Sequence, residues 1–162
     1  MKIKLAENFR AIFYAPFYAL KILDLATNEG VDIEWIESGL PGSAIDDVKR
    51  GAIDLTWGGP MRVMKDHDST PADGASLVCF GEVVSRDPFY LVGKPDPASF
   101  NLHALTHLRV GVVSEVPTPW LCLQADLQDA GIDTASMIDA NRIKIGLTMP
   151  QQLQAIKNGD LD

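Results

Sequence analysis

Cysteine is scarce in this chain, and long apolar runs are absent. The 162 residues include two cysteines, Cys79 and Cys122. Cys79 stands in an apolar run and Cys122 in the first turns of an expected helix, which favours two buried free thiols over a disulfide. No stretch reaches the roughly 18 apolar residues of a membrane-spanning helix. The opening MKIKLAENFR is too polar for a signal peptide. We therefore expect a cytoplasmic protein, or an exported, periplasmic one whose leader has been removed.

Positive charge is also in short supply. The chain has 14 Lys and Arg residues against 22 Asp and Glu, a formal net charge of −8. Without a basic stripe it cannot neutralise many phosphates, so the composition argues against a nucleic-acid partner and against an anionic membrane surface. It sets no limit on a small ligand, because local charge decides that case.

The sequence carries none of the short motifs that mark common catalytic centres. G-x-S-x-G, a Walker loop, G-x-G-x-x-G and C-x-x-C are all absent. His103 and His107 are four residues apart and could share a helical face, as metal ligands do. Leucines dominate that stretch, and no third ligand follows at a suitable spacing. We expect no metal, no cofactor and no catalytic residue.

One pattern repeats along the chain: an apolar strand, a loop rich in Gly, Pro or Ser, and an amphipathic helix. Strands are expected over residues 2–7, 31–36, 52–57, 77–84 and 109–113, with extended structure over 89–93. Helices are expected over 16–28, up to Gly51, from Pro60, over 119–130 and over 150–158. This alternation predicts βαβ units and an α/β fold with mainly parallel sheets.

Several helix boundaries have local signals. Ser43 and Asp46 have the spacing of a capping box, and Pro60 suits a first helical position. Thr118 and Pro119 predict an N-cap followed by the first helical residue. The buried face of the first helix is expected to carry Phe17, Leu20, Leu23 and Thr27, with Gly30 as its stop. The buried face of the fourth is expected to carry Leu123, Leu127 and Ala130, with Gly131 as its stop.

The loops after the strands hold the candidate ligand site, because open parallel sheets bind ligands outside the carboxyl ends of their strands. The candidates are Phe9, Arg10, Phe13, Tyr14, Gly39, Gly42, Ser43, Trp57, Gly58, Gly59, Arg62, Ser114, Glu115, Thr118 and Trp120. Aromatic rings could flank a planar ligand, arginines could pair with an anionic group, and Glu115 could accept from an amine. The alternatives stay open: the aromatics as core, Arg10 as a solvated side chain, and Thr118 as only a helix cap.

Four stretches together resemble a known family. They are ENFRAIFYAPFYAL, EGVDIEWIESGLPGSAIDDVKRGAIDLTWGGPMRVM, VVSRDPFYLVGK and VGVVSEVPTPWLCLQADLQDAGID. In this order they resemble the solute-binding proteins of ABC importers, in the branch for thiamine-pyrimidine precursors, alkanesulfonates, taurine and nitrate. The resemblance spans essentially the whole chain. It implies a periplasmic-binding-protein type II fold, with a first lobe over 1–85, a second over 86–162 and a crossover near 84–89.

The resemblance also carries functional expectations. It implies a small-molecule ligand held between the lobes and a membrane permease as partner. Phe9 to Tyr14, Gly42, Ser43 and Trp57 to Gly59 would line the first lobe, and Ser114 to Thr118 the second. The aromatic candidates and Glu115 favour a planar, pyrimidine-like ligand. Intact members are about twice this length, so we expect a fragment with an incomplete second lobe, or a short form completed by a second chain.

Two other functions occur on related folds. A pyrimidine-precursor synthase carries a Lys after strand three and a His four residues later, where this sequence has Trp57 and Met61. Lys65 and His67 come too late to replace them. An effector-binding domain of a transcription regulator would require a DNA-binding part elsewhere. We therefore predict a binding protein rather than an enzyme.

Overall fold

The computed structural model describes residues 1–37, 42–71, 74, 77–94 and 99–162. It divides into two compact units, Met1–Pro88 and Phe89–Asp162. Each contains a small parallel sheet with helices, which confirms the predicted α/β class. Within the described part of the chain, no helix is both long enough and apolar enough to cross a membrane.

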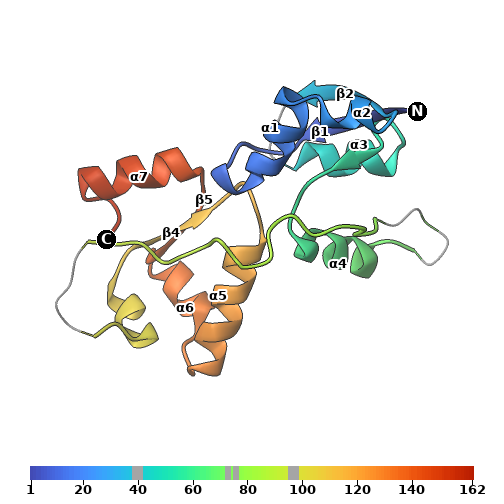
Figure 1. Ribbon diagram of the computed structural model, residues 1–162. Helices are drawn as coiled ribbons and strands as arrows, with labels where there is room; N and C mark the ends of the chain where they lie inside the picture. Colours follow the sequence, from blue (N-terminus) through green and yellow to red (C-terminus); the bar gives the residue numbers. More distant parts are fainter. Residues whose placement is uncertain (38–41, 72–73, 75–76, 95–98) are drawn as a thin grey trace. The chain divides into compact units, whose positions relative to one another are not determined.

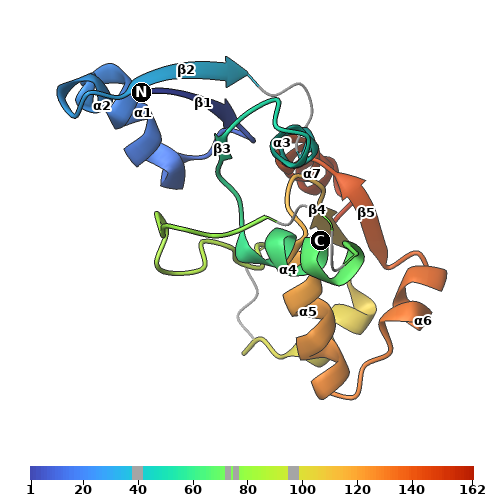
Figure 2. The same ribbon diagram turned by 90° about the vertical axis from the view of Figure 1, so that its right-hand side faces the viewer.

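The first unit is built on a three-stranded parallel sheet in the order β2-β1-β3. β1 (Lys2–Glu7) and β2 (Asp32–Glu37) pair along their whole length and lie side by side in Figure 2. β3 (Leu55–Thr56) is shorter than expected. The reason is local: the Asp54 carboxylate, rather than a backbone carbonyl, accepts the N–H of Lys4 at 2.8 Å, so the ladder starts late. A small apolar core of Ala6, Ala44 and Ile53 packs with Ile36 and Val48.

The first expected helix is broken, contrary to prediction. η1 (Ile12–Tyr14) leads into α1 (Ala15–Ile22), and α2 (Leu25–Asn28) follows separately. Asp24 between them has a left-handed φ of 51°, and its carboxylate accepts the Thr27 hydroxyl at 2.6 Å. Leu23, where α1 ends, is 61% exposed, and Thr27, after the turn, is also exposed. The expected buried face therefore ends at Leu20.

The next two helices agree with the sequence in position but differ in one cap. α3 (Ser43–Lys49) begins at Ser43 itself, so the predicted capping box is wrong. Its N-cap is Gly42, whose φ of 93° belongs to the left-handed region that favours glycine. α4 (Pro60–Ser69) starts at Pro60 as predicted. Gly30 and Gly51 follow the helices before β2 and β3 as the predicted stops, and both have positive φ.

The segments 77–84 and 89–93 form no strands, which corrects the prediction. A strand requires a neighbouring strand to pair with, and the described residues provide none for these two segments. Phe80 is 78% exposed and Tyr90 82%. Cys79 is exposed as well, so the expectation of a buried thiol there is wrong.

The second unit is organised around two parallel strands, β4 (Val110–Val113) and β5 (Ile143–Leu147). In Figure 1, α7 (Met149–Asn158) lies on one side of this sheet, and α5 (Thr118–Asp129) and α6 (Thr134–Asp139) lie on the other. The short helix η2 (Leu102–His107) precedes β4. The core contains Leu105, Val112, Leu127, Ile132, Met137 and Ile143. β5 and α6 were not predicted.

α5 begins one residue earlier than expected. Pro117 is its N-cap and Thr118 its first residue, so the predicted Thr118 cap is wrong. Leu123, Leu127 and Ala130 face the core as predicted. Cys122 lies outside that face and is exposed, which corrects the expectation of a buried thiol.

The residues after α7 are tied to the strand β4. The Arg109 guanidinium donates to both carboxylate oxygens of Asp162, at 2.9 and 2.7 Å. The Asp162 backbone donates to the Arg109 carbonyl and accepts from Lys94, each at 3.1 Å. These bonds hold the segment around Lys94 and the end of the chain together.

Candidate functional site

The strand order of the first sheet creates a topological switch point. From β1 the chain passes to β2 on one side and then to β3 on the other. β1 and β3 are therefore neighbouring parallel strands whose carboxyl ends lie at the same edge of the sheet, and the space outside those ends is where open α/β sheets bind ligands. Asn8 follows β1 directly, and Gly58 follows β3 closely.

Asn8 was not among the predicted site residues. It is 3% exposed, and its Oδ1 accepts the backbone N–H of Gly42 at 2.8 Å. Its Nδ2 is buried and has no hydrogen-bond partner among the described residues. Nδ2 lies 3.7 Å from the place where a Cβ on Gly58 would stand. A buried donor without an acceptor costs about 1–3 kcal/mol, so such a group calls for a function.

Arg62, in the first turn of α4, lies against the same two glycines. A Cβ on Gly42 would stand 2.9 Å from its Nη1, and one on Gly58 would stand 3.5 Å from its Cδ. Burial lowers the pKa of Arg62, yet a guanidinium remains protonated at neutral pH. Asn8, Gly42, Gly58 and Arg62 thus form one group, here called the switch-point cluster. The sequence had predicted three of its four members.

The predicted aromatic residues of the first unit also come together. Phe9, Phe13 and Tyr14 make edge contacts with centroid distances of 4.6 to 6.3 Å. Trp57 stacks on Phe17 at 4.4 Å and 19°, and its Nε1 donates to the Phe9 carbonyl at 3.3 Å. Trp57 is only 4% exposed. Most of the surface of these rings is buried in contacts with one another, so the cluster forms a core, and ligand contact by these residues stays a prediction.

An open cleft of about 810 Å³ lies beside α1 and the carboxyl ends of β1 and β2. Of the predicted residues, Arg10 and Trp57 line it. Glu7, at the end of β1, accepts from the Arg10 Nε at 3.1 Å and from the Tyr18 hydroxyl at 2.9 Å. Burial and the Glu7 contact raise the pKa of Tyr18 to about 12. Trp35 also lines the cleft, with the Lys21 ammonium 5.3 Å from its ring.

Glu7, Tyr18, Lys21 and Trp35 were not among the predicted site residues. The prediction took its candidates from the loops after the strands. Glu7 is the last residue of β1 and Trp35 lies within β2, whereas Tyr18 and Lys21 belong to α1. For Glu7, the sequence did offer one signal of a site residue, which was its position at the end of an expected strand.

The predicted site residues at the junction of β4 and α5, in the second unit, differ in what they contact. Glu115 is 7% exposed, and its Oε1 accepts the N–H of Met149 at 2.9 Å, while Ser114 Oγ donates to Oε2 at 3.3 Å. Glu115 thereby holds the first residue of α7. The Thr118 hydroxyl is buried with no hydrogen-bond partner within the described chain. Trp120 packs against the core of its unit. Ligand contact by these residues stays a prediction.

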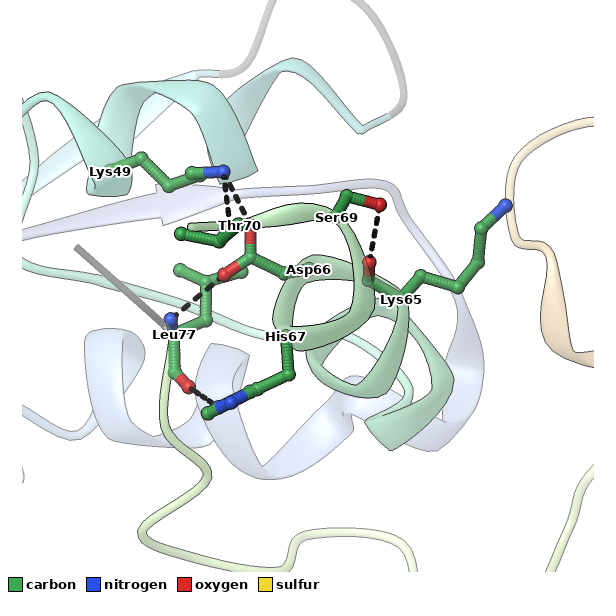
Figure 3. Close-up of polar contacts among 7 residues, drawn as sticks. All are labelled: Lys49, Lys65, Asp66, His67, Ser69, Thr70 and Leu77. Atoms are coloured by element: carbon green, nitrogen blue, oxygen red, sulfur yellow. Dashed lines mark hydrogen bonds and ion pairs between the residues drawn. The ribbon is translucent and has the colours of Figure 1, made fainter. Parts of the chain in front are cut away.

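Another buried polar group anchors the chain after α4 (Figure 3). Asp66 accepts from Lys49 Nζ at 2.5 Å, from Thr70 Oγ1 at 3.1 Å and from the Leu77 N–H at 3.0 Å. His67 Nε2 lies 3.0 Å from the Leu77 carbonyl, and the Lys65 side chain points away from this group. The Lys49 and Leu77 contacts hold the pKa of Asp66 below its usual range. This network fixes the chain at Leu77.

The remaining candidates lie at helix starts, in η2 or outside the described residues. Gly59 is the N-cap of α4, Ser43 begins α3, and Gly39 lies outside the described residues. His103 and His107 lie in η2. Across the described ranges, no group of three or more His, Cys, Asp or Glu residues could hold a metal ion.

No protein-family model, curated protein or solved structure matches the chain. At the switch point the residues of the chain offer hydrogen-bond donors and a cation, next to an aromatic cluster and an open cleft. Such groups suit the recognition of a small molecule.

Proposed function

We propose that this chain is the solute-binding component of an ABC-type importer and that it binds a small planar, hydrogen-bonding ligand of the pyrimidine class. The observation that supports this most strongly is the buried, unpartnered Asn8 Nδ2 at the switch point of the first sheet. Parallel sheets bind ligands at this position. The neighbouring aromatic cluster is consistent with a planar ligand.

The proposal assigns ligand contacts to the first unit, where Asn8, Gly42, Gly58 and Arg62 form the polar side of the site. In the second unit, ligand contact stays a prediction for two candidates, the Thr118 hydroxyl and the Glu115 carboxylate. Thr118 is the stronger one, because its hydroxyl has no hydrogen-bond partner among the described residues whereas Glu115 already accepts from Met149. The partner of the loaded protein would be a membrane permease.

Isothermal titration calorimetry tests the ligand class. We expect 4-aminopyrimidines to bind and simple alkanesulfonates such as ethanesulfonate to bind at least tenfold more weakly. Arg62→Gln should weaken binding, whereas Arg50→Gln should not, because Arg50 is an exposed arginine of the same unit paired only locally with Asp47. Tight binding of ethanesulfonate with none of any aminopyrimidine would overturn the proposed ligand class.

The proposal also assigns no chemistry to the chain. Trp57 and Met61 occupy the positions where the synthase of similar fold carries its Lys and His, which supports a binding role. Incubation with pyridoxal phosphate should then leave its absorbance spectrum unchanged. A new absorbance band characteristic of a lysine aldimine, lost on borohydride reduction, would favour the synthase instead.

A further inference from the structure

We infer that the ligand carries a carboxylate on its planar ring and that the switch-point cluster receives this carboxylate through Asn8 and Arg62. This inference rests on the proposed function, since it names a chemical group of the proposed ligand. It adds a residue, Asn8, that was not among the predicted candidates, and it names the anionic group that Arg62 would receive.

The orientation of the Asn8 amide is settled by its hydrogen bond. Oδ1 accepts from the Gly42 N–H at 2.8 Å, and a flipped amide would set two donors against each other. Nδ2 must therefore point away from Gly42, on the side of Gly58. Its two N–H groups can only donate, so they select an acceptor oxygen.

The neighbouring guanidinium determines the charge of that acceptor. Arg62 Cδ and Nε lie 3.5 and 3.9 Å from the Cβ position of Gly58, and Asn8 Nδ2 lies 3.7 Å from the same point. An oxygen that accepts from Asn8 here is also close to the Arg62 side chain. A carboxylate suits this pair of groups, because its two oxygens accept several hydrogen bonds and pair well with a planar guanidinium.

The two glycines make room for the Arg62 side chain. Gly58 and Gly42 both border Arg62, and a Cβ at either position would approach it within 3.5 Å. The guanidinium can therefore lie beside Asn8 and close to the backbone of the loop. The aromatic cluster is joined to the same loop through the Trp57 bond to Phe9, so a ring attached to the carboxylate would lie toward aromatic residues.

The test compares charged and neutral ligands of the same shape. Calorimetry would measure the affinity of 4-aminopyrimidine-5-carboxylate against its carboxamide, and of benzoate against benzamide. The key variant is Asn8→Asp, which keeps the acceptor for the Gly42 N–H and replaces the Nδ2 donors by a second carboxylate oxygen. Asn101→Asp is the matched control: it makes the same charge change, and its Oδ1 likewise accepts one backbone N–H, that of Ala104.

We expect the wild type to bind each carboxylate at least tenfold more tightly than its amide. Asn8→Asp should weaken carboxylate binding about tenfold to a hundredfold, as expected for a lost hydrogen bond to a charged group, and should leave amide binding within threefold. Asn101→Asp should match the wild type. Should Asn8→Asp fail to fold, Arg62→Gln is expected to remove the same preference.

Equal affinity for carboxylates and amides in the wild type would overturn the inference, as would an equal loss of both in Asn8→Asp. If benzoate shows the preference and neither pyrimidine binds, the carboxylate site stands and the proposed pyrimidine class fails. If 4-aminopyrimidine binds and a carboxylate adds nothing, the proposed function stands and the inference fails.

Discussion

The side-chain oxygen of Asn8 and the backbone N–H of Gly42 are 2.8 Å apart and join the loop after β1 to the start of α3. This bond crosses 34 residues of sequence. It fixes which end of the Asn8 amide faces the switch point. The local structure around α3 and the proposed ligand site thus depend on the same contact.

Gly42→Ala should destabilise the first unit. The left-handed φ of 93° disfavours any side chain, and the new Cβ would stand 2.9 Å from Arg62 Nη1. We expect a loss of about 1–2 kcal/mol in the free energy of unfolding, measured by urea denaturation, together with weaker ligand binding as Arg62 moves. Gly51→Ala is the control: it has a φ of 72° but open space around its Cβ. An equal loss of ligand affinity in both variants would contradict a role for Arg62.

Trp57→Ala should lower the free energy of unfolding by about 3–5 kcal/mol, the range for truncating a large buried aromatic residue. The ring is buried, stacks on Phe17 and donates to Phe9. Trp57→Phe keeps an aromatic ring and should cost markedly less. If Trp57→Phe also binds ligand with unchanged affinity, Trp57 is a core residue only. A stability loss below 1 kcal/mol for Trp57→Ala would contradict the packing described above.

Thr118→Val should stabilise the second unit or leave it unchanged. The substitution keeps the β-branched shape and removes a buried hydroxyl that has no hydrogen-bond partner within the described chain. Removing such a group is expected to raise the free energy of unfolding by up to about 1 kcal/mol. Ligand affinity should fall at the same time if the hydroxyl contacts ligand. A destabilised Thr118→Val would mean that the hydroxyl is satisfied in solution.

Asp66 should make the first unit sensitive to acid. Its contacts with Lys49 and Leu77 depress its folded pKa below the ordinary value of 3.8. The stabilisation is therefore complete above about pH 4 and is lost as the pH falls through the lower folded pKa. Asp66→Asn should be less stable than the wild type at pH 6, with the difference shrinking toward pH 2. Asp68→Asn, at an exposed position on the same helix, is the matched control.

Tyr18 should ionise at a higher pH than an ordinary tyrosine. Its pKa is raised to about 12 by burial and by its hydrogen bond to Glu7. The stabilisation from the neutral phenol is thus present below about pH 10 and is lost as the pH rises toward 12. An ultraviolet titration of the folded protein should show the Tyr18 phenol ionising near pH 12. Tyr18→Phe should remove this step, whereas Tyr90→Phe should retain it, because Tyr90 is exposed.

Local signals account for the features that were predicted correctly. Positive φ at Gly30, Gly51 and Gly131, and the helix start at Pro60, depend on backbone preferences of single residues. The helix break at Asp24 was not predictable in the same way. The break depends on a left-handed φ at Asp24, a residue that carries a side chain. The spacing of apolar residues along the expected helix gives no sign of that conformation.

The strands expected over 77–84 and 89–93 failed for a different reason. Their composition suits extended structure, but a strand exists only where another strand supplies hydrogen bonds. Pairing is a property of the whole fold. By contrast, β1 and β2 pair in full register, and both were predicted to within one residue.

The candidate site likewise combines features that were predicted from the sequence with features that only the fold determined. The sequence alone determined that glycines, aromatics and Arg62 would stand at the carboxyl ends of parallel strands, because the order of elements and the chemistry of the loops are written in it. Only the tertiary structure decided that β1 lies between β2 and β3, which puts the loops after β1 and β3 at one switch point. The tertiary structure also singled out Asn8, a polar residue that nothing in the sequence distinguishes. Its Nδ2 is a candidate ligand donor because it is buried and has no hydrogen-bond partner among the described residues.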